Sequence, residues 1–132
     1  MAQKYIIDDI VMYKNRIHTI IDISASNGYE LSYVRHPVSP VRLSGVPLTP
    51  EILEKNGWRR EDGVFGVSPD FKKIINDPAR KKGYITYLSV YPFFDNDGFS
   101  FFYNNQKLAI IHYVHELQHI LYGLKINSEM EV

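Results

Sequence analysis

The sequence predicts an α+β protein with an N-terminal three-stranded antiparallel meander, a short central helix, an aromatic β-hairpin and a long C-terminal amphipathic helix. Three observations favour this class. β-branched runs separated by turn residues come first, aromatic-rich runs follow residue 84, and apolar residues recur every three or four positions near the C-terminus. Strands therefore gather in two regions, and the longest predicted helix comes last.

The composition fits one soluble domain over residues 1–132. Fifteen basic and fifteen acidic residues cancel, so no overall field favours duplex nucleic acid or an anionic membrane. The sequence has no cysteine, which excludes disulfide scaffolds and cysteine-based zinc sites. Asp8 and Asp9 come too early for a signal peptide, and no apolar run is long enough to span a membrane. We expect a cytoplasmic protein.

The predicted N-terminal β lobe, about residues 4–36, is the meander. Polar turn residues separate its three β-branched-rich runs, which are Tyr5–Tyr13, Ile17–Ile23 and Tyr29–Arg35. In the second run Ile17, Ile21 and Ile23 share one face and Ile20 the other, so the first face is expected to be the more buried one. A small SH3-like sheet is a fair analogy.

A proline-rich connection, about residues 37–48, is expected to run extended and to separate this lobe from a C-terminal α/β lobe of about residues 49–126. A short helix follows it. Thr49 is the predicted N-cap, Pro50 occupies the first helical position and Gly57 marks the stop.

The C-terminal lobe continues with weaker and then stronger signals. Residues 64–67 predict a weak strand, and Ser68-Pro69 is typical of the start of a second short helix through Ile75. Two strong strand candidates, Tyr84–Tyr91 and Phe99–Tyr103, flank a turn over residues 95–98. An apolar stripe from Lys107 to Gly123 predicts the terminal helix, which should pack across this hairpin.

That helix contains the motif H-E-x-x-H. On a helix His115 and His119 can both reach one zinc ion, and Glu116 can act as general base on the metal-bound water. Together with His112 they are expected on the polar face opposite the apolar stripe. A catalytic zinc needs a third protein ligand, and the spacing assigns none. We therefore interpret the face as a binding surface without a cofactor, with a zinc site as the alternative.

Basic and aromatic residues indicate a second candidate region. Seven basic residues, beginning with Arg59 and Arg60, meet four acidic ones before residue 83, an excess that suits a phosphate-bearing ligand or an acidic protein. An ordinary solvated surface has the same composition. Tyr91 belongs to an aromatic set that alternates along its strand, and such faces can stack nucleobases. A core under the terminal helix is the alternative for these aromatic strands.

Two segments carry a family resemblance. Pro47–Trp58 (PLTPEILEKNGW) and Tyr113–His119 (YVHELQH) resemble a family of small uncharacterised proteins of gut Bacteroidetes and their phages. The family pattern is P-L-T-x-x-x-L-x-x-x-G-[FW] and then Y-V-H-x-L-Q, after a segment similar to Asp9–Tyr13; residues 66–98 depart from it. The pattern leaves the position of Glu116 open, and the position of His119 is Asn in some members. The resemblance therefore implies a mobile-element setting and disfavours a zinc protease.

These observations predict a non-enzymatic binding protein of phage or prophage type, in the cytoplasm of a bacterial host. The most specific form is a counter-defence protein that sequesters a nucleotide-like signal or a host protein. The expected partners are a nucleotide-like small molecule or a host or phage protein, and the protein is expected to be a homo-oligomer. The predicted ligand-binding residues are Arg59, Arg60, Tyr91, His112, His115 and His119. The alternatives are a zinc-dependent hydrolase, with His115 and His119 as ligands and Glu116 as base, and a structural or assembly module of a phage.

Overall fold

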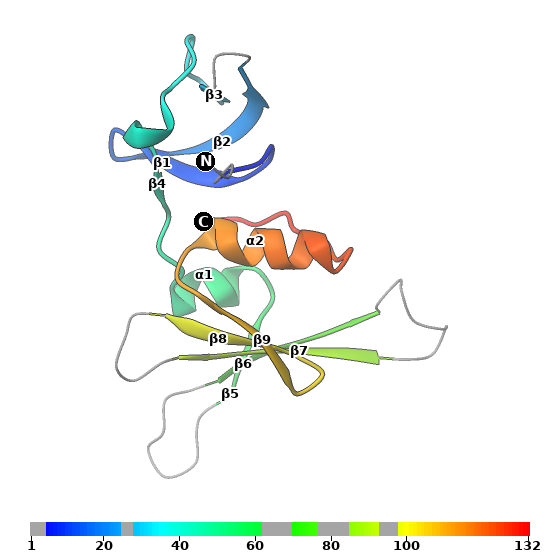
Figure 1. The fold of residues 1–132 in the computed structure, drawn as a ribbon. Coiled ribbons are helices and arrows are strands. Elements are labelled where there is room, and N and C mark those ends of the chain that lie inside the picture. Colours follow the sequence, from blue (N-terminus) through cyan, green and yellow to red (C-terminus); the bar gives the residue numbers. More distant parts are fainter. Residues whose placement is uncertain (1–4, 25–27, 62–69, 77–84, 93–97) are drawn as a thin grey trace.

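The computed structural model describes residues 5–24, 28–61, 70–76, 85–92 and 98–132. Within these residues the chain forms a four-stranded and a five-stranded antiparallel sheet with two short helices between them (Figure 1). The protein is therefore mostly β and belongs to the predicted α+β class. None of the helices in the described ranges has the length and apolar composition needed to cross a membrane.

The N-terminal sheet has the strand order β3-β2-β1-β4. Its strands are β1 (Ile10–Tyr13), β2 (Arg16–Ile23), β3 (Tyr29–Leu31) and β4 (Ser44–Gly45). The predicted meander is confirmed in β1 to β3. Lys14 and Asn15 have φ of 49° and 62°, the left-handed pair that a tight hairpin turn requires. β4 comes from the proline-rich connection and is too short to leave a strand pattern in the sequence.

The buried face of this sheet is the opposite of the predicted one. Ile20 is fully buried, whereas Ile17 and Ile21 are 47% and 56% exposed. Ile20 packs with Val11 and Leu31 of the flanking strands, and the other face meets the helices chiefly through β1. The alternation within β2 alone therefore selects the wrong side, because the neighbouring strands decide which face has an apolar partner.

Helix α1 (Pro50–Lys55) has the predicted punctuation. The Thr49 hydroxyl accepts a hydrogen bond from the backbone N–H of Ile52 at 3.2 Å, and Pro50 is the first helical residue. Gly57 has φ of 87°, a conformation that costs other residues energy, and it ends the helix.

The C-terminal sheet has the order β5-β6-β7-β8-β9. Its strands are β5 (Arg59–Glu61), β6 (Asp70–Asn76), β7 (Ile85–Pro92), β8 (Phe99–Tyr103) and β9 (Gln106–Ile111). The predicted hairpin is confirmed, since Val90 of β7 pairs with Phe101 of β8. The second short helix through Ile75 is wrong, because these residues pair with β5 and β7 as β6. The predicted strand at 64–67 and turn residues 95–97 lie outside the described residues.

The predicted long terminal helix is wrong in its first half. Asn104 and Asn105 have φ of 48° and 68° and turn the chain back, so that residues 106–111 pair with β8 as β9. Helix α2 (Val114–Gly123) therefore has 10 residues. Ile110, the first member of the predicted apolar stripe, is instead 45% exposed on a strand. The predicted end of the helix at Gly123 is confirmed.

Both helices cover one face of the C-terminal sheet (Figure 1). Leu53 of α1 and Leu117 of α2 are fully buried there against Phe71 and Phe101. Each such side chain contributes on the order of 1.5–3 kcal/mol by leaving water. A separate apolar cluster fills the N-terminal sheet around Tyr5, Ile20 and Leu31. The division into one domain with two lobes stays a prediction.

Candidate functional site

The H-E-x-x-H segment opens α2, at the boundary between the two sheets (Figure 1). His115 is only 3% exposed. Its ring stacks on Tyr113, with centroids 5.7 Å apart and planes 13° apart, and meets Tyr5 edge-on at 4.9 Å. The expectation that the three histidines share a polar helix face is wrong, since His112 precedes the helix and His115 is buried between aromatic rings.

Glu116 stabilises the start of α2. Its Oε1 accepts hydrogen bonds from the backbone N–H groups of His112 and Tyr113, at 2.9 and 3.0 Å. These donors have no partner within a helix, and a carboxylate at this end also complements the helix dipole. Helix capping therefore explains the acidic residue of the motif, Glu116.

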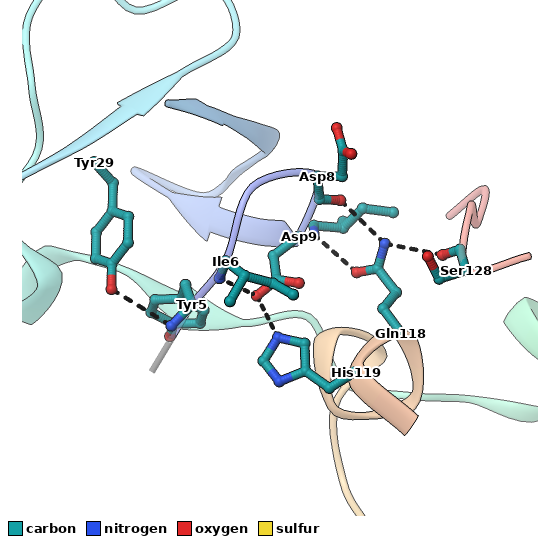
Figure 2. A network of polar contacts seen from close by, with 9 residues as sticks. Tyr5, Ile6, Asp8, Asp9, Tyr29, Gln118, His119 and Ser128 are labelled. Carbon is teal, nitrogen blue, oxygen red and sulfur yellow. Dashed lines mark hydrogen bonds and ion pairs between the residues drawn. The ribbon is translucent and has the colours of Figure 1, made fainter. Parts of the chain in front are cut away.

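The last two residues of the motif bind the N-terminal segment. Gln118 Oε1 accepts a hydrogen bond from the backbone N–H of Ile10 at 3.0 Å. Its Nε2 donates to the carbonyls of Asp8 and Ser128 at 3.1 and 3.3 Å (Figure 2). His119 Nε2 lies 2.7 Å from Asp9 Oδ2 in the same view. Gln118 and His119 therefore tie the N-terminal sheet to α2.

Asp9 is the buried partner of this contact, with 2% of its side chain exposed. Burial raises the pKa of the Asp9 carboxyl above its ordinary value, against the opposing effects of the Ile6 N–H and of His119. The Ile6 backbone N–H donates to Oδ2 at 2.9 Å. The Asp9 carboxyl thus contacts the Ile6 N–H and the His119 ring in a site whose burial disfavours the charged form.

The motif does not assemble a metal site within the described residues. The rings of His115 and His119 have centroids 5.6 Å apart. In the described ranges no three His, Asp or Glu side chains are grouped so that they could hold an ion. The ring of His112 lies elsewhere, against Gly98, where an added Cβ would come within 2.8 Å of its Nε2.

The two predicted arginines lie on opposite faces of β5. Arg60 pairs with Phe71, whose row continues through Val90 and Phe101 on the face that the helices cover. Its guanidinium lies 3.9 Å from Glu54 of α1. Arg59 is on the other face, in register with Lys72. Only one of the two arginines therefore shares a surface with Tyr91.

We call the face of the C-terminal sheet away from α1 and α2 the outer face. The strand registers place three consecutive cross-strand rows on it. The rows are Ile74-Tyr87, then Arg59-Lys72-Ser89-Phe102-Lys107, then Glu61-Asp70-Tyr91-Ser100-Ile110. Ile74, Tyr87 and Ile110 are 59%, 51% and 45% exposed. An apolar and partly aromatic surface therefore faces outward, over the described residues of five strands.

Two aromatic residues meet at the centre of the outer face. Tyr91 and Phe102 lie edge to face, with ring centroids 5.0 Å apart and planes 84° apart. Their cross-strand partners Ser100 and Ser89 are each only 7% exposed. By contrast, Phe99 and Phe101 of β8 face the helices and are core. The aromatic residues of β7 and β8 thus divide between core and surface according to strand parity.

The charged groups of the outer face are arranged around Glu61. Its two carboxylate oxygens lie 2.9 Å from Arg59 Nη2 and from Lys72 Nζ. Hydrogen bonding to Lys72 and Arg59 lowers the pKa of Glu61, and the same contact raises the pKa of Lys72. Desolvation raises the pKa of Asp70, the cross-strand partner of Glu61. The two cations are therefore held in place beside the aromatic pair.

Sequence reasoning missed a cavity of about 600 Å³ between the N-terminal sheet, the helices and the C-terminal segment. Asn56 forms its wall by exchanging two 2.7 Å hydrogen bonds with the backbone of Glu131. Gln118, Asp8 and Ser128 also line it. None of the predicted ligand-binding residues does. The cavity depends on how the N-terminal sheet, the helices and the C-terminal segment pack, which local patterns do not encode.

In comparisons with protein-family models, curated proteins and solved structures, none matched this chain.

Proposed function

We propose that the protein is a non-enzymatic binding protein whose ligand surface is the outer face. The observation that carries this proposal is the juxtaposition of the Tyr91-Phe102 pair with the cations Arg59 and Lys72 on a sheet face that the helices leave uncovered. Exposed apolar and aromatic patches of this kind are typical of binding surfaces.

The ligand class that fits is nucleotide-like. Nucleobases stack on aromatic side chains, and phosphates bind Arg and Lys through charge-assisted hydrogen bonds. Both groups are present in adjacent rows, with Lys72 in register with Ser89 and Tyr91 two residues further along β7. The zero net charge of the chain argues against duplex nucleic acid, which is bound through extended cationic surfaces.

The biological setting rests on the family resemblance of Pro47–Trp58 and Tyr113–His119. It supports a phage or prophage protein that acts in the bacterial cytoplasm by sequestering a nucleotide-like signal, with a host protein as the other partner class. The SH3-like character of the N-terminal sheet stays an analogy and assigns that sheet no role.

Isothermal titration calorimetry against a panel of nucleotides tests the proposal. Arg59→Glu should weaken binding by about tenfold or more, because a phosphate contact becomes a repulsion. Arg60→Glu is the matched control, since it makes the same change one residue away on the opposite sheet face. Equal losses in the two variants, or no binding of any nucleotide by the wild-type protein, would reject the proposal.

The zinc hydrolase remains the second candidate, supported by the adjacency of His115 and His119 on α2. It requires a third ligand and the release of Glu116 from the helix start. Native mass spectrometry of protein purified without chelator or metal column decides it, because stoichiometric zinc would favour the hydrolase.

A further inference from the structure

The outer face places a cationic row between two tyrosine rows. Tyr87, Ser89 and Tyr91 project from β7 onto this face, and Lys72 is the cross-strand partner of Ser89. Arg59 extends the same row on β5. Moving along β7, the face therefore presents Tyr87, then the row with the two cations, which also contains Phe102, and then Tyr91, whose row includes the carboxylates of Glu61 and Asp70.

The spacing of this pattern is set by strand geometry. Residues two apart on one face are about 6.6 Å apart, so Tyr87 and Tyr91 are separated by about 13 Å. Stacked bases in a duplex strand rise by only about 3.4 Å. Two bases resting on these tyrosines must therefore be splayed apart, as in a single strand or a small dinucleotide, with the linking phosphate between them.

From this order we infer that the ligand is two nucleotides joined by a phosphodiester. One base stacks on Tyr87, the other on the Tyr91-Phe102 pair, and the phosphate contacts Lys72 and Arg59. This inference rests on the proposed function, because it uses the same face. A short single strand and a cyclic dinucleotide share this chemistry, and the experiment separates them.

Exposure supports the assignment of the first base. Tyr87 is 51% exposed, and its cross-strand neighbour Ile74 is 59% exposed, so the ring has an open apolar surface beside it. The backbone N–H of Tyr87 donates to Asn104 Oδ1 at 2.9 Å, a bond that does not involve its ring. The tyrosine can therefore be truncated without removing a described hydrogen bond of the sheet.

The test compares ligand lengths. Fluorescence anisotropy with labelled oligothymidylates of one, two, four and eight nucleotides should show affinity rising by about tenfold or more between one and two, because the second base and the linking phosphate are gained together. Calorimetry with a cyclic dinucleotide forms the second arm. Binding of the cyclic compound alone assigns a signal molecule, and binding of the linear series assigns a single strand.

Substitutions on the outer face test which side chains contact the ligand. Tyr87→Ala should reduce the affinity for two nucleotides to that for one, and Lys72→Met should remove the phosphate contribution and flatten the salt dependence. Tyr122→Ala is the matched control, because this tyrosine is 68% exposed on α2. Circular dichroism should confirm that each variant folds as the wild type does.

Three results would overturn the inference. A mononucleotide that binds as tightly as the longer ligands would leave the proposed function standing and remove the two-base site. A Tyr122→Ala variant that loses as much affinity as Tyr87→Ala would assign the effect to another surface. A doubled molecular mass that Tyr87→Ala abolishes, with no nucleotide binding, would assign the face to a second copy of the chain and reject both proposals.

Discussion

Asp9 and His119 form a 2.7 Å contact that joins the N-terminal segment to α2, although 110 residues separate them in the sequence. The carboxylate is almost completely buried, and the imidazole is one-third exposed. A buried ion pair has to overcome the desolvation of its charges, so such a contact adds little net stability but is costly to break on one side.

Replacing Asp9 with Asn should change how stability depends on pH. Because the folded protein raises the pKa of Asp9 above 3.8, folding binds a proton there, and the favourable contribution is lost as pH rises through the folded pKa. Asp9→Asn stays neutral and keeps an acceptor for the Ile6 N–H. The free energy of unfolding of the Asn variant, relative to that of the wild type, should therefore increase with rising pH in urea unfolding curves.

Asp8→Asn is the control for that experiment, since Asp8 is the exposed neighbour in the same segment. Asn tolerates the positive φ of 76° at this position. It should leave most of the pH dependence in place. An Asp9→Asn variant with the wild-type pH profile would show that Asp9 does not take up a proton on folding.

Substitution of Gln118 should destabilise the protein more than substitution of most other described polar residues. Its buried amide satisfies the Ile10 N–H and two carbonyls at once. Gln118→Ala should cost about 2–3 kcal/mol, because buried partners lose their hydrogen bonds. The measurement is urea unfolding together with hydrogen exchange at the Ile10 amide. Gln106→Ala, at an exposed position of β9, should change neither quantity.

The sequence predicts elements well where local chemistry decides them. Thr49, Pro50 and Gly57 bound α1 as expected, because capping and left-handed turns depend on the residues themselves. The boundary between β9 and α2 is not predicted, because the local apolar pattern there fits two kinds of element. Asn104 and Asn105 form a left-handed turn that reverses the chain, but the apolar period continuing past them fits a helix as well as a strand.

The candidate site was predicted only in part, because it depends on register. Arg59 and Arg60 are equivalent in sequence, yet the pairing of β5 with β6 sends them to opposite faces. Lys72 and Phe102 join Tyr91 only through pairing with β7. The histidine motif has the spacing of a metal site, and no local pattern reveals that the N-terminal segment lies over it.

Glu116 variants and added zinc should show whether Glu116 caps α2 or serves a catalytic zinc site. Glu116→Ala should lower stability by about 1 kcal/mol, since two N–H groups at the helix start lose their acceptor. Glu116→Gln keeps an acceptor oxygen and should lose less. We expect zinc to leave the melting temperature unchanged. A zinc-dependent rise that disappears in His115→Ala and His119→Ala would instead support the hydrolase.

Gly45 should not tolerate a side chain. A Cβ added there would lie 2.6 Å from two ring carbons of Tyr113 and 2.9 Å from Cε1 of His115. Gly45→Ala should therefore cost about 1–3 kcal/mol through overpacking. In a Tyr113→Ala background the cost should be smaller, because the nearest obstacle is gone, and a double-mutant cycle measures the difference. Equal costs in both backgrounds would contradict this account.

Glu61 should act as an internal competitor for the proposed ligand. Its carboxylate occupies Arg59 and Lys72, the cations assigned to phosphate, so any anionic ligand must displace it. Glu61→Gln should therefore raise nucleotide affinity about three- to tenfold, with only a small effect on stability, because water screens exposed ion pairs. Glu54→Gln, which removes the partner of Arg60 on the opposite face, is the matched control and should leave affinity unchanged. If Glu61→Gln weakens binding instead, the carboxylate positions the cations for the ligand rather than competing with it.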